Sequence, residues 1–546
     1  MKKLLLSLLT FSTVVMLAGC GNRATGEGNT AGNAADTANT ADTASASDSE
    51  ADGESGSSSS AASDRMLQIG IGSEFSNIVP MSNNVALANR DGLMIFALYD
   101  PLLWFDTEAA ELKPWICTEW EESEDGLEYI LTIRDDVTFH NGTKMTVEDV
   151  VFTLNLIPEN PVVTDANIPG FGHAEVIDDT HCRIVMEQPF AAVPNFLASY
   201  HLLVLSEEYY NEVGWEGYEE HPIGTGPYKF EDRVIGGSMT LSANEEYWNG
   251  APDIKNVRIN ILPDSSAQVL SLETGEIDVL QDSSLQSCAN IEKEEGLNVS
   301  YSDSFKVCFM GWGAKSTLDT DENLRKAVAS AIDYDSINNV LNFGHTKSVS
   351  CLLAPGITDR PEDGTFTAPL GYDPEAAKEY LAASAYDGRA FNIICTQGSK
   401  EENLCRIIQG NLLDIGINAE LSAVDGATFM TYQSEGDYDI NVYSTLPSLY
   451  DANLVYQNFM RGISMFENSN FEYKEELADL GLATLVEMDH AKRQELFAQM
   501  FDIINEHARF LFLYQDCNTM AYNDDVAGCR AIPGTNYRIA DWSWAD

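Results

Sequence analysis

The sequence predicts an α/β protein, because segments with strand and helix patterns alternate along most of the chain. Apolar and polar residues alternate along "LEYILTIRDDVTF" (127–139), as they do in a half-buried strand. In "ENLRKAVASAID" (322–333) the apolar residues recur at the spacing of one helical face. This interleaving argues against an all-β sandwich and against a helical bundle.

The remaining elements follow from the same two patterns. The strands that we expect are 66–71, 127–139, 237–248, 256–262, a short strand after Gly275, 391–396, 417–424, 438–443, 509–515 and 519–523. The helices that we expect are the one in 92–105, which ends before Pro101, one that starts after Thr146, one from 265 to Gly275, and 322–333, 373–384, 402–416 and 491–508.

Three local signals mark a turn and two helix starts. "HNG" (140–142) has the composition of a tight turn. Thr146 stands three residues before Asp149, as in a capping box. Asp373 and Pro374 have the preferred identities for an N-cap and a first helical position.

The N-terminus has the pattern of a secretory signal. Lys2 and Lys3 precede an apolar run that is too short for a bilayer span of about 20 residues. A cysteine directly after Ala18 and Gly19 resembles the lipobox of bacterial lipoproteins, which implies cleavage before Cys20 and a lipid on that residue. The alternative is an ordinary signal peptide with a cysteine nearby.

The segment that follows predicts a tether. Residues 21–64 contain no Val, Ile, Leu, Met, Phe, Trp or Tyr, so they cannot bury enough apolar surface to offset chain entropy. We therefore expect a signal peptide at 1–19 and a lipidated, disordered tether at 20–65, which holds the body at a membrane surface.

Composition limits the classes of partner. The formal net charge is −55, which argues against nucleic acid as a partner, since such binding needs basic patches. A solvated, self-repelling surface is the simplest interpretation of this charge. The chain has ten cysteines, at spacings that match neither a redox motif nor a zinc motif. Disulfides stay open, because sequence does not pair them.

No catalytic or cofactor motif stands out. The chain has no G-x-S-x-G, no HExxH and no P-loop, and "GTGPYKF" (224–230) lacks glycine where a phosphate-binding loop needs it. Acidic pairs occur at every spacing because 86 residues are acidic, so a paired-carboxylate hydrolase stays open without being indicated. We therefore expect a protein that is not an enzyme and has no cofactor and no metal.

Several stretches resemble one family. "LKPWICTEWEESEDGLEYILTIRDDVTFHNGTKMTVEDVVFTLN" (112–155) resembles a characteristic block of the family 5 extracellular solute-binding proteins of ABC importers. "HPIGTGPYKF" and "NEEYWNGAPDIKNVRI" (221–259) resemble the next block, and the resemblance covers roughly 66–530. The residues that carry the first block are Pro114, Trp120, Ser123 to Gly126, Tyr129, Phe139, His140, Gly142, Glu148, Asp149, Val150 and Phe152.

The resemblance implies a two-lobed, type II periplasmic-binding-protein-like fold with an extra domain inserted in the first lobe. Domain I would comprise 66–105, 218–303 and 508–546, domain II 106–217, and domain III 304–507, with lobe crossings near 300–310 and 505–515. It further implies a monomer that captures a solute, most simply a peptide, by hinge closure. Its partners would be the permease and ATPase subunits of an importer. The alternatives are a non-peptide ligand (a metal chelate, haem, glutathione-like or sugar compound) or, from another class, a secreted hydrolase or adhesin.

The resemblance also suggests binding residues. In peptide-binding members an Asp in a domain III loop pairs with the ligand's amino group; here Ser448 occupies the aligned position, and Asp451 is the carboxylate nearby. Either Asp451 does this work, or the ligand has no free ammonium group there. The other candidates follow from their places in the fold and are Phe75, Asn77, Arg90, Trp312, Arg360, Tyr443, Tyr450 and Tyr514.

Overall fold

The computed structural model describes residues 65–81, 91–159, 168–459 and 468–545. All of them belong to the compact unit formed by 58–546. The predicted signal peptide, Cys20, nearly all of the predicted tether and Arg90 lie outside the described residues.

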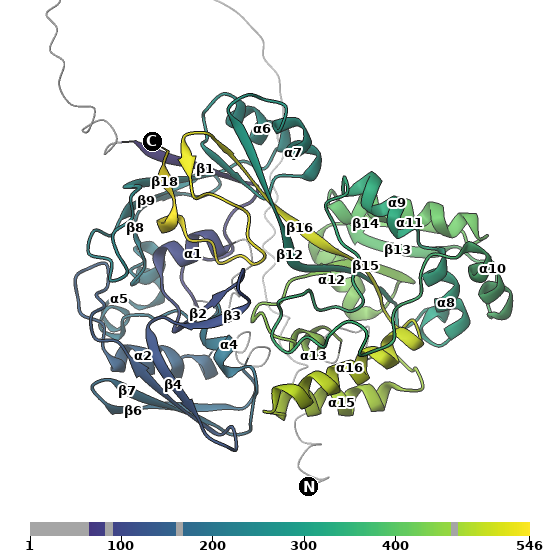
Figure 1. The fold of residues 1–546 in the computed structure, drawn as a ribbon, viewed down its shortest axis with the longest axis horizontal. Coiled ribbons are helices and arrows are strands. Elements are labelled where there is room, and N and C mark those ends of the chain that lie inside the picture. Colours follow the sequence, from purple (N-terminus) through teal and green to yellow (C-terminus); the bar gives the residue numbers. More distant parts are fainter. Residues whose placement is uncertain (1–64, 82–90, 160–167, 460–467, 546) are drawn as a thin grey trace, which may run out of the picture. The chain divides into compact units, whose positions relative to one another are not determined.

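Ten strands form one large mixed sheet (Figure 1). Short apolar runs with β-branched residues make up most of them, as the sequence predicts. In spatial order they are β14 (Ala419–Val424), β13 (Phe391–Thr396), β15 (Ile440–Thr445), β12 (Leu297–Trp312), β16 (Leu511–Asn523), β11 (Val279–Gln281), β1 (Met66–Ile71), β10 (Asn256–Ile261), β9 (Ser238–Ala243) and β8 (Tyr228–Val234).

Two long strands run through the centre of this sheet. β12 and β16 are antiparallel neighbours, and Figure 1 shows them side by side between the two groups of shorter strands. The ladder has irregularities between Asp303 and Val307 and between Cys308 and Phe309. The expectation of separate strands at 509–515 and 519–523 is wrong: residues 511–515 and 519–523 lie in the one strand β16, because pairing with the long β12 continues across the polar residues between them.

A smaller sheet and a hairpin lie in the segment between β1 and β8. The small sheet has the order β4–β5–β7–β6, and the hairpin joins β2 and β3. Their bounds are β2 (Leu103–Asp106), β3 (Glu111–Pro114), β4 (Cys117–Glu122), β5 (Glu128–Ile133), β6 (Phe171–Asp178) and β7 (His181–Met186). β5 is shorter than the expected strand 127–139, because the chain turns into the polar Asp135 and Asp136.

Local sequence signals set several helix boundaries. The predicted capping box is present: the Thr146 backbone N–H donates to the Asp149 carboxylate (2.9 Å) at the start of α2 (Val147–Asn155). The Asp373 carboxylate accepts from the N–H groups of Glu375 and Ala376 at the start of α10 (Pro374–Ala383), as predicted. The helix in 92–105 ends at Leu98, before Pro101, as predicted.

Some helices cover the two faces of the large sheet, and others pack on the small sheet or on one another. They are α1 (Gly92–Leu98), α2 (Val147–Asn155), α4 (Val193–Leu197), α5 (Glu207–Glu220), α6 (Ser265–Glu273), α7 (Leu285–Ile291), α8 (Glu322–Ala331), α9 (Tyr334–Ser336), α10 (Pro374–Ala383), α11 (Lys400–Asp414), α12 (Gly426–Glu435), α13 (Leu454–Phe459), α15 (Lys474–Val486) and α16 (His490–Glu506). Short helical turns (Ile157–Glu159, Thr317–Asp319, Ile337–Leu341 and Ile539–Asp541) and a two-residue pair, β17 (Val526–Ala527) with β18 (Ser543–Trp544), complete the described part.

The cysteines contribute to the core as thiols. In the described part of the chain nine cysteines are unpaired, and all but Cys517 are buried. Desolvation by burial raises the pKa of Cys182 and of Cys308 to about 12, so both stay protonated at neutral pH. They pack as small apolar residues, as their strand contexts predict.

Candidate functional site

The ends of four strands approach one another along β16. β1 and β11 are parallel neighbours, and so are β13 and β15. β11 ends beside Thr519, whose carbonyl accepts from the Asp282 backbone N–H (3.1 Å). β15 ends beside Val307, which pairs with Gln515. Gln515 and Thr519 are four residues apart, so the carboxyl ends of both parallel pairs reach a stretch of β16 about 13 Å long.

The connections leave β1 and β11 on opposite faces of the sheet. Val279 of β11 packs in the cluster that contains Leu67 of β1 and helix α1. The next residue, Leu280, packs in a different cluster with Ile291 of α7. Successive side chains of a strand point to opposite faces, so α1 and α7 cover opposite faces. Ligands of open α/β sheets bind beside such a change of direction.

β13 and β15 repeat this arrangement. Helix α11, which follows β13, packs through Leu404 in the cluster that contains Cys395. The loop after β15 packs through Leu449 in the cluster that contains Ile394, on the opposite face of β13. Both parallel pairs thus offer the geometry of a ligand site at the same stretch of β16.

Five charged residues lie at this stretch, and we call them the strand-end cluster: Asp282, Lys306, Lys400, Glu401 and Asp516. Lys400 Nζ donates to Asp516 Oδ1 (2.7 Å), and Lys306 Nζ lies 3.6 Å from Asp516 Oδ2. Burial alone would raise the pKa of Asp516, but the two ammonium groups outweigh it and hold that pKa below its ordinary value. Asp516 is therefore an ionised carboxylate that links α11 to the two long strands β12 and β16, which we call the crossing strands.

Polar and aromatic groups border the strand-end cluster. Glu401 accepts a hydrogen bond from Ser444 Oγ of β15 (2.7 Å). The Lys400 ammonium lies 5.0 Å from the centre of the Tyr514 ring. Tyr514 is buried, and within the described residues its phenol has no hydrogen-bond partner. A buried polar group without a partner is costly and is a candidate contact for a ligand.

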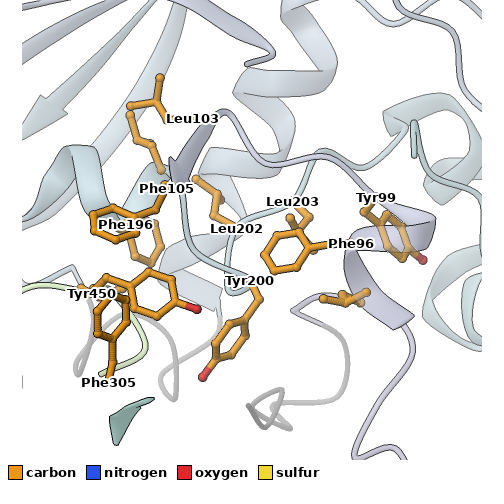
Figure 2. Packing of buried hydrophobic residues seen from close by; sticks show 14 of the residues in the cluster. Phe96, Tyr99, Leu103, Phe105, Phe196, Tyr200, Leu202, Leu203, Phe305 and Tyr450 are labelled. Carbon is orange, nitrogen blue, oxygen red and sulfur yellow. The ribbon is translucent and has the colours of Figure 1, made fainter. Parts of the chain in front are cut away.

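The predicted residue Tyr450 joins separate parts of the chain. Its ring stacks on Phe105 of β2 (centroids 4.9 Å apart) and lies 5.5 Å from the ring of Phe305 of β12, as Figure 2 shows. Its hydroxyl accepts from the Thr535 backbone N–H (3.0 Å), and its φ is +52°. This loop residue is buried at a contact between segments, in a backbone region that non-glycine residues rarely occupy.

The predicted residue Asp451 is held in a buried ion pair. Arg493 of α16 donates to both Asp451 oxygens (2.7 and 2.8 Å) and to Asp359 (2.6 Å). Asp451 is only 1% exposed, so its carboxylate is committed to Arg493. These contacts favour a structural role for Asp451 over the role of an amine-binding residue.

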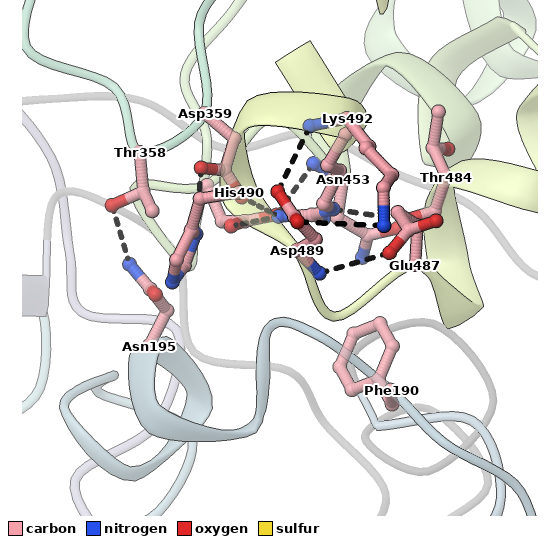
Figure 3. A network of polar contacts seen from close by, with 12 residues as sticks. Phe190, Asn195, Thr358, Asp359, Asn453, Thr484, Glu487, Asp489, His490 and Lys492 are labelled. Carbon is pink, nitrogen blue, oxygen red and sulfur yellow. Dashed lines mark hydrogen bonds and ion pairs between the residues drawn. The ribbon is translucent and has the colours of Figure 1, made fainter. Parts of the chain in front are cut away.

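Further contacts hold this loop in place. The Thr358 N–H donates to the Tyr450 carbonyl (3.0 Å), and the Ala452 N–H donates to the Thr358 carbonyl (2.9 Å). Figure 3 shows Asn195 of α4 reaching Thr358 Oγ1 (3.1 Å) and His490 Nδ1 reaching Asp359 (2.8 Å). These hydrogen bonds hold the loop after β15 in one conformation.

Two more of the predicted ligand residues, Tyr443 and Ser448, lie at the end of β15 and in the loop after it. Tyr443 is half-buried, with its ring edge-on to Phe309 (5.7 Å) and stacked near Phe429 (6.3 Å). Ser448 is half-buried in the loop itself. Both stay predicted ligand contacts.

Two of the predicted ligand residues, Trp312 and Arg360, make contacts with other parts of the protein. Trp312 is fully buried, and its indole N–H donates to the Ala508 carbonyl (3.0 Å), so it is a core residue here. Arg360 donates to the carbonyls of Leu353 (2.9 Å) and Pro361 (3.0 Å) and pairs with a nearby carboxylate. These contacts use its guanidinium and favour a loop-holding role.

The loop after β1 contains two further predicted residues. Phe75 is buried in the core. Asn77 Oδ1 accepts from the N–H groups of Ile78 (2.7 Å) and Val79 (3.3 Å), which shapes the turn. Both follow β1 at the expected strand end, and their contact with a ligand stays a prediction.

The sequence reasoning missed all five members of the strand-end cluster. The signal was present in part: Asp282 lies two residues after the expected short strand that follows Gly275, and Lys400 follows another expected strand by four residues. Nothing in the sequence shows that these two positions face the same stretch of β16. That proximity comes from strand pairing alone.

Other features of the described chain are weaker candidates for a functional site than the strand ends are. A hollow of about 660 Å³ lies between α15 and α16, away from the strand ends, and Glu476 and Asp479 are among its lining residues. Among the described residues, no group of three or more His, Cys, Asp or Glu side chains is placed to hold a metal ion. None of the helices described is both long and apolar enough to span a membrane.

Comparison with known proteins gives consistent matches. Oligopeptide-binding protein AppA of Bacillus subtilis is 23% identical over 474 residues, covering 80% of this chain and 84% of AppA. The structure of NikA from Brucella suis with Fe(III)-EDTA matches with a TM-score of 0.79 at 20% identity, covering 88% of this chain and 100% of NikA. The structure of DppA from Helicobacter pylori with the peptide STSA matches with a TM-score of 0.73 at 20% identity, covering 88% and 98%.

A family model covers the middle of the chain. The model described as bacterial extracellular solute-binding proteins, family 5 Middle, matches residues 111–465, which is more than half of the chain. The match includes the block at 112–155 on which the resemblance rests, and the fold of the solved relatives is that of type II periplasmic binding proteins. This chain belongs to the family 5 bacterial extracellular solute-binding proteins.

Proposed function

We propose that this protein is the solute-binding component of an ABC importer and that its solute is a peptide. One observation carries the proposal: the carboxyl ends of two parallel strand pairs meet at Gln515–Thr519, with the strand-end cluster between them. Ammonium and carboxylate groups placed there suit a ligand that carries both charges.

The family and its named members support the ligand class. AppA is named as an oligopeptide-binding protein, and the DppA structure holds a peptide. NikA, whose structure holds Fe(III)-EDTA, represents the alternative of a metal chelate. Identification of the ligand that co-purifies with the protein distinguishes a peptide from a metal chelate.

We also propose the division into domains given above. The lobe crossings predicted near 300–310 and 505–515 fall in or next to β12 and β16, the two long strands between the two groups of shorter strands. The small sheet β4–β5–β7–β6 falls within 106–217. A hinge motion would then act on the two crossing strands.

The proposed location is the outer face of a membrane, through a lipid on Cys20. Metabolic labelling with a palmitate analogue tests it directly. We expect label on the full chain and none on the Cys20→Ala variant. Label that persists in that variant, or a mature chain that begins elsewhere than at residue 20, would reject the anchor.

The soluble body, residues 65–546, provides the test of ligand class. Native mass spectrometry of the purified body, followed by release and sequencing, identifies what co-purifies. Peptides are the expected result, and adding them back should raise the unfolding temperature, because a ligand selective for the folded state stabilises it. A released metal chelate or other non-peptide compound would replace the peptide proposal, and turnover of the added compound would reject the transport role.

A further inference from the structure

Asp282 occupies a special backbone position at the end of β11. Its φ is +54°, in the left-handed region that only Gly, Asn and Asp occupy readily. Its own N–H is bonded to the Thr519 carbonyl, so this conformation continues directly from the sheet. The strained residue thus stands at the point where the sheet geometry predicts a ligand.

The Asp282 carboxylate is free, unlike its neighbours. Its side chain is exposed, and within the described residues no hydrogen bond or ion pair reaches its oxygens. Asp516 is bonded to Lys400, Glu401 to Ser444, and Asp451 to Arg493. Of these acidic side chains, Asp282 is therefore the one able to accept a new hydrogen bond without breaking an old one.

The surroundings of Asp282 favour a cation beside it. The strand-end cluster holds three carboxylates and two ammonium groups, a formal charge of −1 at neutral pH. One ligand ammonium group would neutralise the cluster, whereas a ligand carboxylate would add to its excess charge.

We propose that Asp282 binds the free ammonium group of the ligand, in place of the domain III loop residue that would do so at position 448. Ser448 carries no charge, and the carboxylate of Asp451 is already paired with Arg493. The negative charge that the ligand needs is then supplied by Asp282, at the end of β11. The inference rests on the proposed function and extends it to a selectivity for ligands with an unblocked amine.

A competition between two peptide pools tests this. The body, residues 65–546, is mixed with equal amounts of a random tetrapeptide pool and the same pool acetylated at its N-terminus. Native mass spectrometry then gives the ratio of free-amine to acetylated peptide bound. We expect at least a tenfold preference for the free amine in the wild-type protein and a ratio near one in Asp282→Asn.

The variants are chosen to keep the fold. Asn tolerates a positive φ, and Asp282→Gly, which suits it even better, removes the carboxylate by a second route. Asp179→Asn makes the same chemical change on the exposed turn between β6 and β7 and should keep the wild-type ratio. Thermal unfolding of each variant confirms that it is folded.

The outcomes separate the two proposals. Tetrapeptide binding with an unchanged ratio in both Asp282 variants would overturn the role of Asp282 and leave the peptide proposal standing. A wild-type protein that binds neither pool would overturn the peptide proposal and, with it, this inference. Equal loss in Asp179→Asn would show a general charge effect and would also overturn it.

Discussion

Arg493 and Asp451 form a two-bond ion pair (2.7 and 2.8 Å) in which neither side chain is exposed to solvent. Arg493 also pairs with Asp359 at 2.6 Å, so two buried carboxylates share one guanidinium. The pair joins helix α16 to the loop after β15. That loop carries Tyr450, and its position therefore depends on Arg493.

Loss of this guanidinium should destabilise the protein strongly. Arg493→Met leaves the carboxylates of Asp451 and Asp359 buried without their partner, which we expect to lower the free energy of unfolding by about 3–5 kcal/mol. Urea unfolding measures the change. Lys492→Met, at the residue directly before Arg493 on the same helix, removes only an exposed contact with Asp489 (3.4 Å) and serves as the control. Equal stability of the two variants would contradict the prediction.

A second substitution tests the packing of Tyr450. A Cβ on Gly534 would lie 2.5 Å from the Tyr450 hydroxyl and 2.7 Å from the Thr107 methyl. Gly534→Ala should lower the free energy of unfolding by about 1–3 kcal/mol, because the site has no room for a methyl group. Gly371→Ala, where no atom lies within 4 Å, should change it little. Combining Gly534→Ala with Tyr450→Ala should give less than the sum of the two losses; full additivity would show that the residues do not interact.

Stability should fall as the pH falls from about 6.5 to 4. Burial lowers the pKa of His140 and of His201 to about 4, while the unfolded chain titrates near 6.5. Between these values the unfolded state binds more protons, so each histidine can remove at most about 3 kcal/mol of stability. His140 is also bonded in its neutral form, since Nδ1 accepts from the Gly224 N–H (3.1 Å).

A substitution assigns this pH dependence. In urea unfolding at pH 7, 6, 5 and 4.5, His140→Gln should lose stability less steeply than the wild-type protein does. His221→Gln, at an exposed position, should keep the wild-type slope. Identical slopes in all three proteins would show that His140 titrates normally.

The unpartnered phenol of Tyr514 should separate stability from binding. Tyr514→Phe removes a buried hydroxyl that has no partner in the described structure, so the free protein should be as stable as the wild type or up to about 1 kcal/mol more stable. Binding of the co-purifying solute, measured by calorimetry, should weaken if the hydroxyl contacts it. Tyr228→Phe breaks a bond to the Ile254 carbonyl (3.1 Å) and should cost about 1 kcal/mol without affecting binding. A Tyr514→Phe protein that binds normally would remove Tyr514 from the site.

Short-range patterns predicted much of the fold. Thr146 and Asp149 are three residues apart, and their capping box forms as the sequence indicates. The strand at 66–71 has its predicted bounds, since alternation and β propensity need only neighbouring residues. The turn at 140–142 also forms, with Gly142 at φ +86°. The family block at 112–155 identified the fold because it combines many such local features in one order.

The binding residues were harder to predict, because their roles depend on distant partners. Asp451 is a plausible ligand residue in the sequence, and only the approach of Arg493, 42 residues further along, commits its charge elsewhere. Trp312 stands beside two glycines like a stacking residue, yet the Ala508 carbonyl, 196 residues away, accepts its N–H inside the core. Asp282 is not indicated by the sequence for the converse reason: no motif surrounds it.

The sequence by itself determined the alternation of helices and strands, the family and the order of the elements, because these depend on local periodicity, capping and turn chemistry. Tertiary structure alone decided that 511–515 and 519–523 belong to one strand, because β12 pairs with both. It also decided that the carboxylates of Asp516 and Asp451 are paired with cations, whereas no partner reaches that of Asp282 in the described part of the chain. The pairing of β11 and β15 with the crossing strands brings Asp282, Lys306, Lys400 and Asp516 to one place, and electrostatic interactions act through space, whatever the separation along the chain.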